Sequence, residues 1–278
     1  MSLRLSVGFM FYLGIVVCMV APPMGWSDTI TLTTGKKVVG KIVGLTEDRT
    51  GLIMDVDGKR VVYHQSEIHF IDAEQESEGI NTVPMYGGRP KVPADQEFIE
   101  TATKEAGSKE IASQQYVELG RNYLDTGHPK TAMKRFNQAW LLNPNNADVF
   151  LGFGSVALAQ RDADGAIDMF NRAITLNPQY GKAMCLSCVA HLVKASKIGL
   201  ASPTASPYIH KSAQLCEAGS VIEPQQELCY STWATALFLQ NQYAQAWDKV
   251  RKARALGGKT LSADFLKELS GAMPEPPN

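Results

Sequence analysis

Apolar residues recur at helical spacing through most of the chain after residue 108, and one stretch of this pattern returns further along. The sequence AMKRFNQAWLLNP at residues 132–144 is followed, 34 residues later, by AIDMFNRAITLNP at residues 166–178. A repeat of this length with two amphipathic helices per unit is typical of stacked helix pairs, because one pair cannot bury its apolar face alone. The pattern therefore predicts an α-helical array in the larger part of the chain.

The repeat pattern predicts four helix pairs and a closing helix within residues 108–271. The third unit is 46 residues long, which exceeds the period of 34 by 12 residues. The surplus fits residues 196–207, SKIGLASPTASP, whose prolines and serines indicate a loop between two helices. Loops of this length often carry recognition. The expected pairs are 113–146, 147–180, 181–226 and 227–260, followed by a cap helix at 261–271 and a tail at 272–278.

Small residues stand where the paired helices would cross, and phenylalanines stand where neighbouring pairs would meet. A proline closes each of the first two units. In this pattern the units resemble tetratricopeptide repeats. The resemblance implies a curved array whose first helices line a concave groove that binds protein or peptide partners. The residues that carry it are Gly120, Ala132, Phe136 and Pro144 in the first unit, and Gly154, Ala166, Phe170 and Pro178 in the second.

By that resemblance, one face of the first helices is expected to contact the partner. More than half of its side chains are apolar, which favours an amphipathic helix or an extended segment as the ligand. Val117 and Leu151 do not fit repeats that grip a chain-terminal carboxylate, which place Lys and Asn there. The competing expectation is a groove filled from within, by the helix at residues 98–106 or by the linker. The expected groove residues are Gln114, Val117, Arg121, Leu124, Leu151, Ser155, Leu158, Val189, Leu192, Thr235 and Phe238.

Residues 28–72 follow a different pattern, with short β-branched runs separated by the turn signals TG, EDRTG and VDGK. Five short strands fit this segment, and so few residues bury enough apolar surface only by curling into a small barrel. The segment resembles a small Sm-like or SH3-like β-barrel, which implies that the chain could assemble into rings through it. Residues 73–107 are expected to be a linker with a short helix at 96–106.

The first 27 residues are expected to be a secretory signal peptide. Arg4 precedes an apolar run from Val7 to Ala21, and two prolines end the run. The preferred cleavage is after Ser27. An uncleaved anchor and lipid attachment at Cys18 are the alternatives, although the run is shorter than the roughly 20 residues of a spanning helix. The chain is therefore expected in the bacterial periplasm or cell envelope.

Four cysteines follow the predicted signal, and an even number in an exported protein suggests disulfides. In the repeat pattern, a bridge between Cys188 and Cys216 would join two helices of the third unit, and Cys185 with Cys229 could form a second bridge. Buried thiols remain an alternative. The CLSC stretch from Cys185 to Cys188 also allows a redox pair or a zinc site, but it lies inside a predicted helix with no βαβ pattern nearby.

Composition narrows the function classes that the pattern allows. The chain has 278 residues, a formal net charge of -1 and 45% hydrophobic residues, without the basic run that nucleic-acid binding needs. The sequence contains no zinc-protease, hydrolase or nucleotide-binding signature. We therefore expect a non-enzymatic exported adaptor or scaffold that needs no cofactor and holds partner proteins. The alternative is a thiol-dependent redox or metal-binding envelope protein that uses Cys185 and Cys188.

Overall fold

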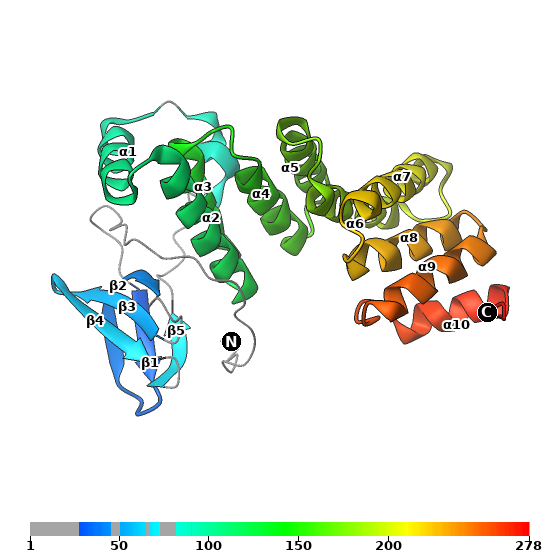
Figure 1. Cartoon of the computed structure of the whole chain (residues 1–278), viewed down its shortest axis with the longest axis horizontal. Helices are drawn as coiled ribbons and strands as arrows, with labels where there is room; N and C mark the ends of the chain where they lie inside the picture. Colours follow the sequence, from blue (N-terminus) through cyan, green and yellow to red (C-terminus); the bar gives the residue numbers. More distant parts are fainter. Residues whose placement is uncertain (1–27, 46–50, 65–66, 73–81, 90, 278) are drawn as a thin grey trace. The chain divides into compact units, whose positions relative to one another are not determined.

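The computed structural model of the chain describes residues 28–45, 51–64, 67–72, 82–89 and 91–277 (Figure 1). The predicted signal peptide at 1–27 and the first part of the predicted linker, 73–81, lie outside the described residues. The chain divides into two compact units, Met1–Asn145 and Asn146–Asn278, and each is described by itself.

The first unit begins with a five-stranded antiparallel sheet in the order β4-β3-β2-β1-β5. An Asp57-Gly58 pair joins β3 to β4, and both residues have the positive φ that a tight hairpin turn requires. Ile30, Val38 and Met54 form the small core on one face of the sheet. The strands are β1 (Asp28–Leu32), β2 (Lys37–Leu45), β3 (Gly51–Val56), β4 (Lys59–His64) and β5 (Ile68–Asp72).

The five expected strands are present, but the expected barrel is not established. Closing the sheet would require its two outer strands, β4 and β5, to pair with each other. The strand pairings of the described residues leave β4 and β5 at opposite edges. The barrel and its Sm-like or SH3-like character therefore stay predictions.

The helical part of the first unit begins earlier than the sequence predicts. Helix α1 (Pro93–Ala106) starts three residues before the expected helix, and the ring of Phe98 packs edge-on against Tyr116 of α2 (Lys109–Asp125) at 5.3 Å between centroids. Ser108 caps α2 by accepting a hydrogen bond from the backbone N–H of Ile111. Helix α1 thus belongs to the packed helices, although the sequence placed it in a linker.

The first helix pair approaches closely at Gly120, as predicted, but Phe136, which was expected between neighbouring pairs, lies inside this pair. Helix α2 packs against α3 (Pro129–Leu142) with Gly120 directly on the Phe136 ring. A Cβ atom at Gly120 would lie only 2.5 Å from that ring. Phe136 is fully buried, and the Ser113 hydroxyl donates to the carbonyl of Ala139 on the opposing helix. Close approach at a glycine therefore holds this pair together.

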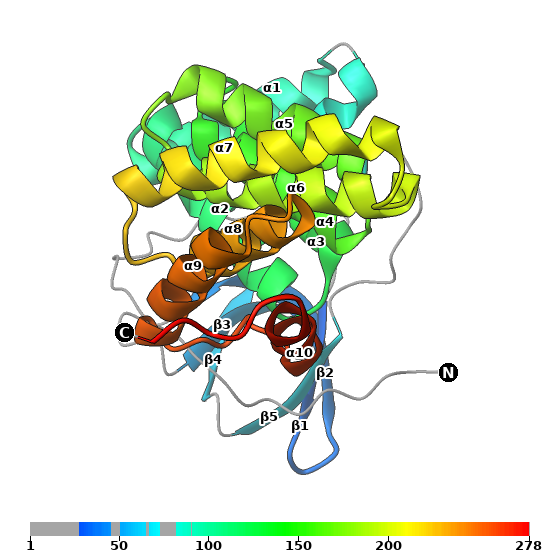
Figure 2. The same cartoon turned by 90° about the vertical axis from the view of Figure 1, so that its right-hand side faces the viewer.

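The second unit contains three further helix pairs and a closing helix (Figure 2). Gly154 packs against Phe170 as Gly120 does against Phe136, with 2.5 Å from a hypothetical Cβ to the ring. Successive pairs pack through α5 with α6 and through α7 with α8. The helices are α4 (Ala147–Ala159), α5 (Ala163–Leu176), α6 (Gly181–Ile198), α7 (Ser206–Ile222), α8 (Glu227–Leu239), α9 (Tyr243–Ala255) and α10 (Ala263–Ala272).

Three of the four pairs turn from the first helix to the second in the same way. A single residue with left-handed backbone follows the first helix, namely Gly127, Arg161 or Asn241. The next backbone N–H then bonds back to a carbonyl five residues earlier, which closes the helix end. The third pair instead has an inserted connection at residues 199–205, which contains the short helix η4 (Pro203–Ala205). It is shorter than the predicted loop at 196–207, because α6 and α7 both extend into that stretch.

The expected cap helix is present as α10, and the expected tail is packed against the fold. Leu269 of α10 is fully buried, and Phe265 packs edge-on against Phe238 of α8. The Trp247 indole N–H donates to the carbonyl of Met273, and the Arg254 guanidinium pairs with Glu275. In the described part of the chain, no helix combines the length and apolar character needed to cross a bilayer.

Candidate functional site: the first-helix row and the insertion pocket

The predicted groove residues of the second unit lie on its first helices α4, α6 and α8, where α6 contacts both neighbours. Leu151 is only 2% exposed and belongs to the interior, so its expected place on an open face is wrong in this conformation. The remaining six are half-buried: Ser155, Leu158, Val189, Leu192, Thr235 and Phe238. The hydroxyls of Ser155 and Thr235 donate to carbonyls of their own helices.

Internal packing occupies two of these side chains. Phe238 lies between the rings of Tyr243 and Phe265, each 5.7 Å away between centroids. Leu192 packs against the buried cluster that includes Ala205 and Ile209. The groove of the second unit is therefore partly filled from within, by α9, α10 and the inserted segment. We call the four remaining residues, Ser155, Leu158, Val189 and Thr235, the first-helix row.

In the first unit, Gln114, Arg121 and Leu124 are half-buried on α2, and Val117 is fully buried. The side chains of Gln114 and Arg121 both donate to the carboxylate of Glu118, at 3.1 and 2.8 Å. Val117 thus does not present a surface to a partner in this conformation, which corrects its expected role. Whether the other three contact a partner stays a prediction.

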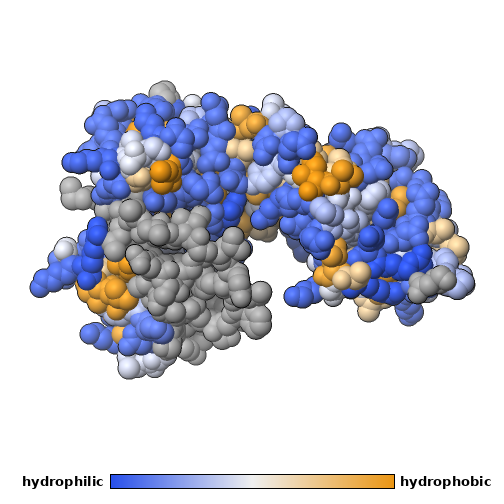
Figure 3. Space-filling view, in the orientation of Figure 1, coloured by the Kyte–Doolittle hydropathy of each residue, from blue (hydrophilic) through white to orange (hydrophobic). Residues whose placement is uncertain are grey.

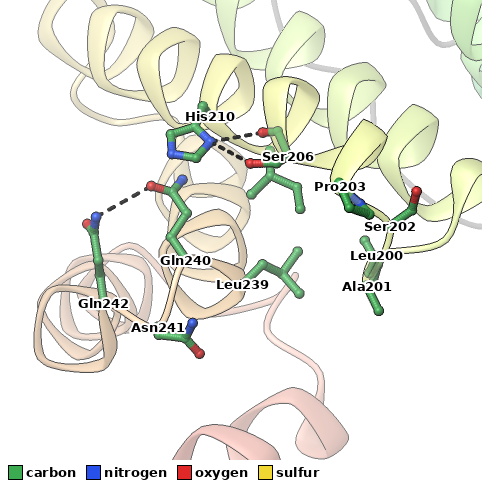
Figure 4. Close-up of a pocket in the computed structure, with 11 residues that line it drawn as sticks. Leu200, Ala201, Ser202, Pro203, Ser206, His210, Leu239, Gln240, Asn241 and Gln242 are labelled. Atoms are coloured by element: carbon green, nitrogen blue, oxygen red, sulfur yellow. Dashed lines mark hydrogen bonds between the residues drawn. The ribbon is translucent and has the colours of Figure 1, made fainter.

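The inserted segment of the third pair forms one wall of a pocket of about 360 Å³ (Figure 4). Gly199 ends α6 with a φ of 101° that favours glycine, and Ser202 caps the short helix η4 that leads into α7. The opposite wall is the turn between α8 and α9. The pocket is lined by Leu200, Ala201, Ser202, Pro203, Ser206, Ile209, His210, Leu239, Gln240, Asn241 and Gln242.

The pocket has a polar side and an apolar side. In Figure 4 the Gln240 amide points toward the His210 ring, whereas Leu239 points toward the segment that carries Leu200. The Gln242 amide donates to the Gln240 oxygen at 3.4 Å, but the buried Gln240 Nε2 has no hydrogen-bond partner among the described residues. His210 Nδ1 lies 2.9 Å from the Ser206 carbonyl, which can only accept. Nδ1 is therefore the donor, and Nε2 is the acceptor in this tautomer.

The four cysteines of the second unit gather in one buried cluster. Cys185 of α6 is bonded to Cys229 of α8, and Cys188 of α6 is bonded to Cys216 of α7. All four side chains are at most 1% exposed. The structure thus places both predicted pairs at disulfide distance, one within the third helix pair and one between the first helices of neighbouring pairs. A redox role would need an accessible sulfur atom, and none of the four is accessible.

One histidine beside this cluster is also buried. His191 of α6 is 6% exposed, and its Nδ1 lies 2.8 Å from the carbonyl of Ser187. Burial lowers its pKa, the hydrogen bond to Ser187 opposes this, and the nearby Lys211 lowers the pKa further. His191 therefore favours the neutral form and acts as a packed residue of the interior.

A segment of the first unit that the sequence assigned to the linker is held against α3. The Asn137 side chain donates to the carbonyl of Val83 at 2.8 Å and accepts from the N–H of Tyr86 at 3.4 Å. The Arg89 guanidinium covers the Tyr86 ring and bonds to both carboxylate oxygens of Asp95. Hydrogen bonds from Arg89 lower the pKa of Asp95, and burial raises that of Tyr86. A lone aromatic within a Pro/Gly-rich stretch was the signal for this contact.

The surface of the second unit carries no broad apolar patch in the view of Figure 3. Hydrophobic atoms there form small islands among hydrophilic side chains. Of the large apolar side chains on its helices, Leu176 is 40% and Val221 78% exposed. Polar and half-buried positions thus dominate this face of the second unit.

No protein-family model matches the chain. Among solved structures, TTC0263, a thermophilic tetratricopeptide-repeat protein of Thermus thermophilus, matches 59% of this chain and 84% of its own at 15% identity, with a TM-score of 0.50. The pilF protein of Pseudomonas aeruginosa matches 59% and 69% at 14% identity, with a TM-score of 0.49. MamA matches 59% and 84% at 20% identity, with a TM-score of 0.43. By its match to TTC0263, the helical part of this chain shares the fold of tetratricopeptide-repeat proteins.

Proposed function

We propose that this chain is an exported, non-enzymatic adaptor that binds partner proteins in the bacterial cell envelope. Binding occurs through the first-helix row of the second unit. The observation that carries this proposal is the packing of α4, α6 and α8, which brings half-buried side chains of separate helix pairs onto neighbouring helices. Stacked repeats of this kind form extended binding surfaces.

The composition of the row favours a peptide-like partner. Leu158 and Val189 supply apolar contact, and the hydroxyls of Ser155 and Thr235 still have lone pairs to offer after bonding to their own helices. No charged residue belongs to the row. An amphipathic helix or an extended segment with apolar anchors matches such a surface better than a charged chain end does.

Two observations support export. The first 27 residues have the basic start, apolar run and small residues of a secretory signal. The second unit contains two disulfides, and disulfides persist mainly in oxidising compartments. The alternative redox or metal function gains no support, because the sulfur atoms that it needs are bonded to one another and buried.

Partner capture with matched variants tests the proposal. We would immobilise the wild type, Leu158→Asp and Ser155→Arg, and compare the proteins recovered from envelope extract by quantitative mass spectrometry. The control is Leu176→Asp, which makes the same chemical change at an exposed leucine of α5. We expect both row variants to lose at least about tenfold of the specific partner signal, whereas the control keeps it.

Circular dichroism melting of each variant separates lost binding from lost folding. If the row variants melt like the wild type and recover the same partners in the same amounts, the first-helix row is not the binding surface.

A further inference from the structure

The insertion that interrupts the 34-residue repeat forms one wall of a pocket, and the other helix pairs have no such insertion between their helices. Their turns consist of one left-handed residue, whereas α6 extends to Ile198 and residues 199–205 then lead into α7. These residues stand opposite the next turn, at Gln240 to Gln242, across the pocket of about 360 Å³. This volume is at the lower end of the range for ligand sites in proteins.

The polar side of the pocket offers one donor and one acceptor. Gln240 Nε2 is a buried donor without a partner among the described residues, and such a group costs free energy until it is satisfied. His210 Nε2 is an acceptor, because Nδ1 donates to Ser206. In Figure 4 the Gln240 amide and the His210 ring face each other. A peptide group presents one carbonyl and one N–H, so it can satisfy both after a small rotation of the Gln240 side chain.

The apolar side of the pocket selects for an aliphatic group. Leu200, Ile209 and Leu239 line it, and Leu200 is 44% exposed. Its eleven lining residues include no Lys, Arg, Asp or Glu, which disfavours charged ligands such as phosphates and chain-terminal carboxylates. They also include no Trp, Tyr or Phe on which a nucleobase could stack.

We propose that the insertion pocket binds an internal, uncharged peptide segment with an aliphatic side chain. One peptide group of the segment bonds to Gln240 and His210, and its side chain lies against Leu200 and Leu239. This inference rests on the proposed function, since the segment belongs to a partner protein. It adds a second contact beyond the first-helix row, with its own chemistry.

Photo-crosslinking with a defined probe tests the pocket directly. The probe is acetyl-Gly-photoleucine-Gly-amide, applied to the full chain, and the labelled residues are located by mass spectrometry. We expect labelling to concentrate in residues 199–210 and 239–242. Gln240→Ala should lower the labelling at least about fivefold, because the variant loses a hydrogen bond between uncharged groups of the pocket and the ligand. Gln245→Ala, the same change on the exposed side of α9, should leave labelling unchanged.

Competition and a second variant complete the test. Acetyl-Gly-Leu-Gly-amide should suppress labelling, whereas acetyl-Gly-Asp-Gly-amide and N-acetylglucosamine should not. Ala201→Trp, at an exposed position of the pocket wall, should block labelling by filling the pocket. Uniform labelling along the chain, equal labelling of Gln240→Ala and wild type, or equal suppression by all three competitors would overturn the proposal.

The two proposals can fail independently. If pocket labelling behaves as expected while Leu158→Asp still captures all partners, the first-helix row is rejected and the pocket stands. If Leu158→Asp loses its partners but the probe does not label the pocket, the first-helix row is supported as the binding surface and the pocket proposal is rejected.

Discussion

Removing the two disulfides one at a time should reveal how strongly they constrain the second unit. Cys188 and Cys216 lie inside the chain segment that Cys185 and Cys229 close, so the two loops are nested. Cys185→Ala/Cys229→Ala removes the outer bridge and keeps the inner one. Cys188→Ala/Cys216→Ala does the reverse, and a fourfold variant removes both.

The loop lengths set the expected magnitude. A crosslink lowers the entropy of the unfolded chain by an amount that grows slowly with loop length. Separations of 44 and 28 residues correspond to about 4 and about 3.6 kcal/mol when each bridge acts alone. With the inner bridge intact, the outer one closes an effective loop of only about 17 residues and contributes about 3 kcal/mol. We expect each single removal to cost about 3 kcal/mol and removal of both about 6 to 7 kcal/mol.

Thermal unfolding with and without a phosphine reductant is the assay. For a unit of this size, 1 kcal/mol changes Tm by about 3 to 4 °C, so each single removal should lower Tm by about 10 °C in oxidising buffer. In reductant, all bridges are open, and any remaining difference reports only the packing of the lost sulfur atoms. The reasoning is refuted if oxidised and reduced wild type melt together, or if the variants differ from wild type equally in both buffers.

Three further predictions concern single residues. Gly154→Ala should destabilise the second unit by about 1 to 3 kcal/mol, because the added Cβ would clash with the Phe170 ring. The control is Gly271→Ala, whose Cβ would meet no neighbouring atom, so this variant should be neutral or stabilising. Urea titrations measure both effects. The pKa of His191 is lower in the folded chain than its unfolded value of about 6.5, so the unfolded state binds more protons below that pH. The contribution of His191 to the free energy of unfolding is therefore complete above about pH 6.5 and decreases as the pH falls. Urea midpoints should show this decrease in the wild type and less of it in His191→Gln. Asn137→Ala should remove the two hydrogen bonds to residues 83–86 and raise their amide hydrogen exchange severalfold, while exchange in α8 stays unchanged.

The helix pairs could be predicted from sequence because their contacts are periodic. Gly120 and Phe136 touch across one pair, and the same two residue types recur 34 positions later as Gly154 and Phe170. Each local pattern therefore repeats the packing of the one before it. The cysteine pairs followed from the same register, since helix positions fix which side chains face one another.

The open face of the groove could not be predicted in the same way. Whether Val117 and Leu151 are exposed depends on how closely neighbouring segments pack against them. The spacing of apolar residues in the sequence does not predict that distance. The pocket could not be predicted either, because Leu200 and Gln240 line one pocket only after α7 and α8 have packed. The contact of Tyr86 with α3 was missed because a Pro/Gly-rich stretch looks like a linker until a specific partner such as Asn137 holds it.

The residues that follow α10 have a practical consequence for handling the protein. Trp247 is 1% exposed, and its indole N–H depends on the carbonyl of Met273 for a partner. Trimming the chain after Ala272 would leave this donor unsatisfied and would also delete the carboxylate that pairs with Arg254. Intrinsic tryptophan fluorescence should move to longer wavelength in such a shortened protein. An affinity tag is therefore better joined through a flexible spacer beyond Asn278 than substituted for the last few residues.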